Sequence, residues 1–176
     1  MPNFQKHLGK LIGWLAVSEL LCLILAFSFA IIGGTVAKYL GLILGLTAHI
    51  LLMRNAAHSA ADACVIYYRK DKIRVSSRFI VALGILSAIP HYLLYVWLLI
   101  CSDSIAVRNV FPLLEAMYLQ IFQLIFGNTE TVSALSFSAK CLTALPQFCT
   151  PIVVICSFGN RYESSIAAED ANSCKV

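Results

Sequence analysis

The sequence contains little charge. Only 12% of its 176 residues are Asp, Glu, Lys or Arg, against roughly 25% in an average soluble domain. Hydrophobic residues make up 60% of the chain, so too few polar side chains remain to cover a water-facing surface. The composition therefore excludes an ordinary soluble globular protein and predicts an all-α integral membrane protein.

The sequence also lacks the motifs of common catalytic and metal sites. It has no zinc-type Cys/His spacing, no HExxH or GxSxG motif and no phosphate-binding Gly-rich loop. We therefore expect no enzyme activity, no metal and no cofactor. We expect the seven cysteines to be free thiols. However, Cys101 and Cys141 would meet at the outer membrane edge if the chain crossed four times. Whether they form a bridge stays open.

Apolar segments separated by short links divide the chain into one membrane domain, residues 1–162. A spanning helix needs about 20 apolar residues. The predicted spans cover residues 11–33, 36–53, 79–101 and 139–158, and the second continues as a cytoplasmic helix to about residue 70. Residues 111–127 are too short and polar for a clear span, which predicts an interfacial or re-entrant helix, with five spans if it crosses. The polar tail, residues 163–176, is predicted to be disordered.

The basic residues predict the orientation of the bundle. They concentrate at the amino terminus and between the second and third spans, and cytoplasmic loops are rich in Lys and Arg. We therefore expect a multi-pass protein of the cell membrane with a cytoplasmic amino terminus. The carboxyl terminus is cytoplasmic with four spans and outside with five. Because the cations flank apolar runs, they indicate contact with a lipid bilayer and anionic lipid heads at 69–78, not with nucleic acid.

Small residues predict how the first two helices pack. In each helix they recur every four residues, which places them on one face. The seam consists of Cys22, Ala26 and Ala30 in the first helix and Ala37, Gly41 and Gly45 in the second. The Gly33-Gly34 turn makes the helices antiparallel, which pairs Ala30 with Ala37, Ala26 with Gly41 and Cys22 with Gly45. One turn further, Glu19 meets His49.

This intramembrane pair supports two hypotheses. It is either a polar clasp that fixes the helix register, assisted by Ser18 and Thr47, or a site that binds protons or cations. An acid in the middle of the first helix, Glu19, is similar to that of the small multidrug resistance exporters. The similarity covers one helix and one residue, and it implies a residue that binds protons and cations.

Two prolines mark a second polar layer. Pro90 interrupts the third span and is followed by His91, and Pro146 in the last span is followed by Gln147. Proline removes a backbone hydrogen bond and kinks a helix, and kinked polar positions in mid-membrane often line transport sites. We expect His91 and Gln147 to lie at a similar depth and to face each other.

These features favour a non-enzymatic accessory or scaffold subunit, with a homo-oligomer or another membrane subunit as its partner. The alternative is a small proton- or cation-coupled transporter that uses Glu19, His49 and the kinks around Pro90 and Pro146.

Overall fold

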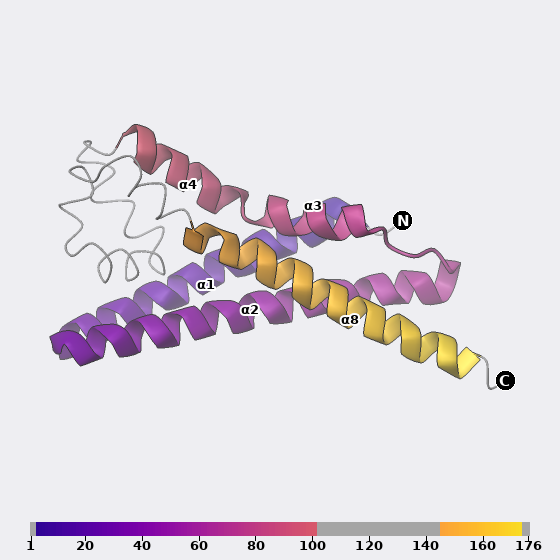
Figure 1. Cartoon of the computed structure of the whole chain (residues 1–176), viewed down its shortest axis with the longest axis horizontal. Helices are drawn as coiled ribbons and strands as arrows, with labels where there is room; N and C mark the ends of the chain where they lie inside the picture. The colour runs from indigo at the N-terminus through magenta and orange to yellow at the C-terminus, as the bar shows by residue number, and fades with distance from the viewer. Residues whose placement is uncertain (1–2, 102–144, 174–176) are drawn as a thin grey trace.

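The computed structural model describes residues 3–101 and 145–173, and these residues are helical with no strand among them. The predicted all-α class is confirmed. The elements are α1 (Phe4–Ile32), α2 (Gly34–Asp71), α3 (Ser77–Ser87), α4 (Ile89–Ile100), a 3-10 turn η2 (Leu145–Phe148) and α8 (Cys149–Ser173). They form one elongated bundle, in which α3 and α8 pack along the α1–α2 pair (Figure 1).

Helices α1 and α2 form a long antiparallel hairpin. Its turn is at Gly33, whose φ of 74° lies in the region that glycine adopts without steric cost. Helix α1 begins earlier than the predicted span, because the Asn3 side chain accepts a hydrogen bond from the Lys6 amide at 3.2 Å and caps the helix. Helix α2 continues beyond the apolar segment to Asp71. Both helices are long and apolar enough to cross a membrane.

Helices α3 and α4 together make a third candidate span, with a bend of 40° between them. The Ser76 hydroxyl caps the start of α3 by accepting from the Phe79 amide at 3.3 Å. The break falls at Ala88, and Pro90 lies in the first turn of α4. Since proline has no N–H to donate and its ring clashes with the preceding turn, the bend occurs where the sequence predicts a kink.

Helix α8 corrects the prediction for the tail. Residues 163–173 belong to this helix, so the predicted disorder is wrong for them. They are held by the buried side chain of Ile166 and by ion pairs from Glu169 to Arg69 and from Asp170 to Arg74. Of the predicted last span, only the part from Leu145 onward is described, and α8 is not among the candidate spans found in the described residues. The predicted interfacial helix, 111–127, and Cys141 lie outside the described residues.

The apolar core lies mainly at the end of the bundle that holds both described chain ends (Figure 1). There α1, α2, α3 and α8 pack around small side chains of α2, and the largest side chains in this core are Tyr162 and Phe158. The far half of the α1–α2 hairpin is different, because its apolar side chains face outward; Ile31 is 87% exposed and Val36 74%. An apolar face of this kind is suited to lipid.

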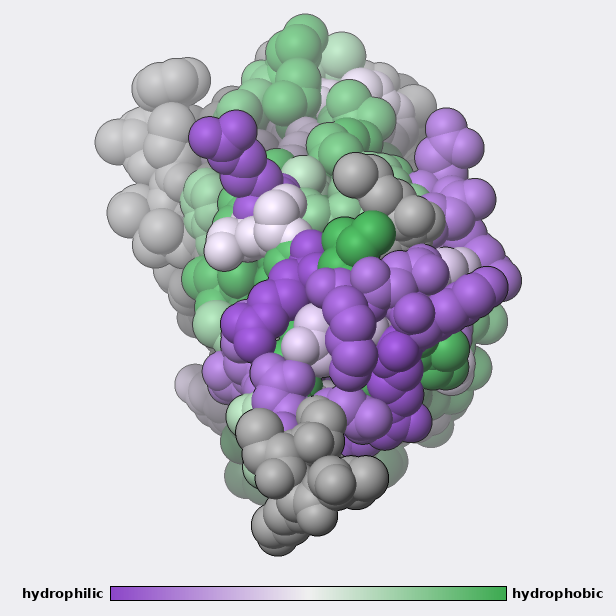
Figure 2. Space-filling model, turned by 90° about the vertical axis from the view of Figure 1, so that its right-hand side faces the viewer, coloured by the Kyte–Doolittle hydropathy of each residue, from purple (hydrophilic) through white to green (hydrophobic). Residues whose placement is uncertain are grey.

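The surface of the molecule is polar at the end that lies opposite the Gly33 turn. Figure 2 shows hydrophilic side chains gathered over the end to which α2 and α8 run. Three ion pairs link α8 to α2 and the loop after it: Arg69 to Glu169 at 2.8 Å, Arg74 to Asp170 at 3.0 Å and Arg161 to Asp62 at 2.8 Å. All three are partly exposed, so each contributes about 0–1 kcal/mol. Together they fix the position of α8 along the end of α2.

Candidate functional site

The contact between the small residues of α1 and α2 positions the residues of the candidate site. Ala37, Gly41, Gly45 and His49 are all buried, at every fourth position of α2. The thiol of Cys22 donates to the Gly45 carbonyl at 3.4 Å, which is the pairing that the small-residue pattern predicts. At Gly41 the neighbour is different. A Cβ added there would lie 3.1 Å from the Cβ of Phe29, so Phe29 covers this glycine.

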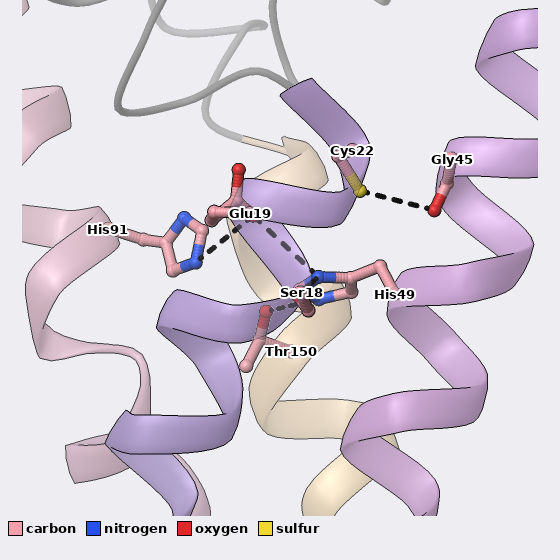
Figure 3. A network of polar contacts seen from close by, with 7 residues as sticks. All are labelled: Ser18, Glu19, Cys22, Gly45, His49, His91 and Thr150. Carbon is pink, nitrogen blue, oxygen red and sulfur yellow. Dashed lines mark hydrogen bonds and ion pairs between the residues drawn. The ribbon is translucent and has the colours of Figure 1, made fainter. Parts of the chain in front are cut away.

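One turn from Cys22, the carboxylate of Glu19 lies between two histidines (Figure 3). Its Oε1 is 3.7 Å from Nδ1 of His49 on α2 and 3.8 Å from Nε2 of His91 on α4. The two imidazole rings are edge to face, with centroids 6.2 Å apart. We call Glu19, His49 and His91 the Glu19 cluster. The structure therefore brings together residues of three helices, where the sequence predicts a pair.

No hydrogen bond joins His91 to Gln147, the two residues of the predicted second polar layer, both of which the structure describes. The side chain of Gln147 is buried in η2, and neither of its amide atoms has a hydrogen-bond partner among the described residues. Its neighbour Phe148 packs against Tyr92, with ring centroids 6.3 Å apart, so η2 approaches the first turns of α4. The bend before α4 places His91 against Glu19.

Two hydroxyl groups hold the imidazole of His49. Ser18 Oγ lies 2.7 Å from Nδ1, and Thr150 Oγ1 lies 2.9 Å from Nε2. A neutral imidazole has one donor and one acceptor nitrogen, and a hydroxyl can play either role, so both contacts fix the ring in either tautomer. The sequence suggests Ser18 but also Thr47, whose side chain is exposed. The sequence does not predict a role for Thr150, since no feature of the apolar segment around it indicates a polar contact.

The cluster is almost sealed from solvent. Ser18, His49 and Thr150 are fully buried, and only 11% of the Glu19 side chain is exposed. A single carboxylate inside a membrane costs about 3 kcal/mol on insertion scales. Two neighbouring imidazoles reduce that cost, because the three groups can hold one proton in several arrangements: a neutral acid with neutral rings, or a carboxylate beside an imidazolium. The three groups therefore have the chemistry to share one proton.

The first turns of two helices supply two of the five residues of this site. His91 lies in the first turn of α4, just after the bend, and Thr150 lies in the first turn of α8. Next to the bend, the Ser87 hydroxyl donates to the Gly84 carbonyl at 2.7 Å, which satisfies a carbonyl near the helix break. The position of His91 therefore depends on the bend, and that of Thr150 on where α8 begins.

Other polar groups of the described chain do not form a second site of this kind. Residues 3–101 and 145–173 contain no group of three His, Cys, Asp or Glu side chains with the geometry of a metal site. Cys101 is a free thiol. His7 and Cys64 are both buried at the polar end of the bundle, where Nε2 of His7 lies 3.9 Å from Sγ of Cys64. Both side chains pack within the core there.

Comparison with protein-family models, with curated proteins and with solved structures gives no match to this chain. The structure itself shows a small helical protein with two candidate membrane spans, or three if the bent α3–α4 pair is one span. The chemistry of the Glu19 cluster is therefore the basis for a function.

Proposed function

We propose that this protein is a proton-coupled membrane transporter in which Glu19 binds and releases the proton. One observation carries the proposal: a single oxygen of the Glu19 carboxylate faces the imidazoles of His49 and His91, at 3.7 and 3.8 Å. Carboxylates and histidines inside membranes are rare and mark proton pathways. Histidine is also the side chain whose charge changes most readily near neutral pH.

The third member of the cluster favours transport over simple packing. A contact between Glu19 and His49 is enough to fix the register of α1 and α2. His91 adds a second proton acceptor at the same oxygen, and it comes from a helix that starts at a 40° bend. Since a bend between two helix segments can act as a hinge, the proton on the cluster can influence how α4 lies against α1.

The arrangement of α8 supports four spans with both termini in the cytoplasm. The acidic residues at the end of α8 pair with Arg69 and Arg74, and Lys10 of α1 bonds to Ser59 of α2 at 2.6 Å. Both described chain ends therefore lie at the polar end of the hairpin (Figure 1). The density of Lys and Arg at this end is typical of a cytoplasmic side.

The proposal is tested by proton flux into vesicles that contain the purified protein and a pH-sensitive dye. We expect flux in vesicles with the wild-type protein and flux no higher than in protein-free vesicles for Glu19→Gln. The control is Glu163→Gln, which makes the same chemical change on the exposed surface of α8 and should leave flux unchanged. Circular dichroism checks that both variants fold. Wild-type flux in folded Glu19→Gln, or no flux above empty vesicles for the wild type, would overturn the proposal.

A second candidate is the non-enzymatic accessory or scaffold subunit. It is favoured by His49, whose two ring nitrogens are held by hydroxyls of α1 and α8, because such bonds also join helices inside membranes. In this case Glu19→Gln should weaken the folded protein without any flux to lose. Cross-linking in the native membrane followed by purification should then recover a membrane partner in fixed proportion to this chain, and recovery of the chain alone would contradict this candidate.

A further inference from the structure

The polar end of the hairpin has a definable membrane boundary. About 20 helical residues cross the hydrocarbon layer, and this number counted from the Gly33 turn reaches Gly13 on α1 and Met53 on α2. Trp14 is 38% exposed, and tryptophan is enriched at membrane interfaces. Arg54 is the first charged residue of α2 after Lys38. The headgroup layer therefore begins near Trp14 and Arg54.

Two lysines of α1 lie on one face at this boundary. Lys10 is three residues, or about 4.5 Å, before Gly13 and lies in the headgroup layer. Lys6 is seven residues, or about 10.5 Å, before Gly13, just outside the layer, which its long flexible side chain can reach. Lys6 and Lys10 are exposed, and four-residue spacing aligns them with Trp14 along the helix. Lys10 Nζ donates to Ser59 Oγ of α2 at 2.6 Å, which uses one of its three N–H donors. Within the described part of the chain, neither lysine forms an ion pair with a carboxylate.

Most other cations of this end are neutralised or lie too far from the bilayer. Arg161, Arg69 and Arg74 each pair with an acid. The loop after α2 starts about 17 residues past Arg54, or about 26 Å at 1.5 Å per residue, whereas the headgroup layer adds only about 5–8 Å on each side. This geometry makes Arg69, Lys70, Lys72 and Arg74 poor contacts for anionic lipid. Arg54 itself lies on the face of α2 that carries His58 and Asp62.

The surface beside Lys10 is open and becomes apolar within about two helical turns. Gly13 lies on the same face, and a Cβ added there would meet no atom within 4 Å. The next residue along this face, Val17, is 50% exposed. A bare helix surface, with cations on one side and apolar side chains on the other, matches a phospholipid whose headgroup lies over its acyl chain.

We infer that Lys6, Lys10, Trp14 and Ser59 bind the phosphate of an anionic phospholipid in the cytoplasmic leaflet. The two ammonium groups supply charge, the Ser59 hydroxyl and the Trp14 indole N–H supply hydrogen bonds, and an acyl chain follows Val17. The inference requires only that α1 and α2 cross a membrane and is independent of proton transport.

The test compares lipid retention by the full chain. The protein is taken from vesicles of equal amounts of phosphatidylglycerol and phosphatidylcholine into mild detergent, and bound lipids are counted by native mass spectrometry. The wild type should retain phosphatidylglycerol preferentially, and the double variant Lys6→Gln, Lys10→Gln should lose this preference. The matched control, Lys70→Gln with Lys72→Gln, removes two exposed charges at the far end of α2, beyond the layer, and should keep the preference.

Three outcomes would overturn the inference. The first is that the double variant Lys6→Gln, Lys10→Gln keeps the preference for phosphatidylglycerol, and the second is that the control variant loses this preference equally. The third is that inorganic phosphate at millimolar concentration displaces the lipid. The last outcome would mean an anion site without lipid specificity. Proton flux is measured in parallel and should be unchanged in both variants, so a failure here is distinguishable from a failure of the proposed function.

Discussion

Helix α3 packs tightly against α8 at Gly84, and replacing this glycine by alanine tests the contact between the two helices. A Cβ at this position would lie 2.4 Å from Cγ1 and 3.0 Å from Cδ1 of Ile155, and 3.2 Å from the carbonyl oxygen of Pro151. Ile155 can change its side-chain conformation. The Pro151 carbonyl belongs to the backbone of α8 and cannot move without the helix. The substitution therefore forces the two helices apart or strains Ile155.

The expected magnitude comes from two opposing effects. Overpacking of a filled core costs about 1–3 kcal/mol, while alanine gains about 0.5–1 kcal/mol over glycine inside a helix. We expect Gly84→Ala to lower the free energy of unfolding by about 1–2 kcal/mol. The matched control is Gly159→Ala in α8, where an added Cβ meets nothing within 4 Å. This variant should gain about 0.5–1 kcal/mol.

The assay is reversible unfolding in mixed micelles, followed by circular dichroism as the denaturing detergent is increased. The double variant Gly84→Ala, Ile155→Ala removes the side chain that the new methyl group would strike, so it should be less destabilised than the sum of the single variants. If Gly84→Ala were as stable as Gly159→Ala, or if the two effects at Gly84 and Ile155 were simply additive, α3 and α8 would not cross at this point.

Three further predictions use the same unfolding assay. Thr150→Val should lower the free energy of unfolding by about 1–2 kcal/mol, because it leaves a buried nitrogen of His49 without its hydroxyl partner. It should also shift the ¹⁵N resonances of the His49 ring. Thr150→Ser, which keeps the hydroxyl, should restore both the stability and the resonances. The Val75 amide donates to the Tyr162 hydroxyl at 2.7 Å, so Tyr162→Phe should cost about 1 kcal/mol. Burial also raises the pKa of Tyr162; the wild type should therefore lose stability as the pH rises above about 10, the value for unfolded tyrosine, and the Phe variant should lose less. A chain that ends at Tyr162 lacks Ile166 and should lose about 2 kcal/mol and become more sensitive to protease; unchanged stability would contradict the packing of α8.

The sequence predicted the hairpin and its register because both depend on local features. A glycine turn fixes the direction of α2, and the 3.6-residue period then carries the register from residue to residue along both helices. This is why Cys22 lies at Gly45 and Glu19 near His49. Gly41 departs from the pattern, since the bulky Phe29 fills the space beside it.

The remaining contacts of the site join segments far apart in the chain, and local patterns do not determine them. Pro90 indicates a bend but not its direction, and the direction is what brings His91 to Glu19. Thr150 reaches His49 only because α8 packs along α2. The polar composition and terminal position of the tail predict disorder. The ion-pair partners that hold it, Arg69 and Arg74, lie about 100 residues away in the sequence, where local patterns do not reveal them.

The contacts of α4 and α8, the two helices that complete the site, restrain these helices to different degrees. Helix α8 is continuous for 25 residues, about 37 Å at 1.5 Å per residue, and it is anchored at both ends: Thr150 bonds to His49, and Asp170 bonds to Tyr68 at 2.7 Å. Helix α4 starts at a bend, and outward-facing apolar residues such as Leu93 are exposed along it. A proton that arrives at Glu19 changes its attraction to His91 directly, whereas the anchors of α8 do not include the carboxylate. In a proton-coupled cycle, α4 is therefore the helix that we expect to move, with α8 as the fixed support.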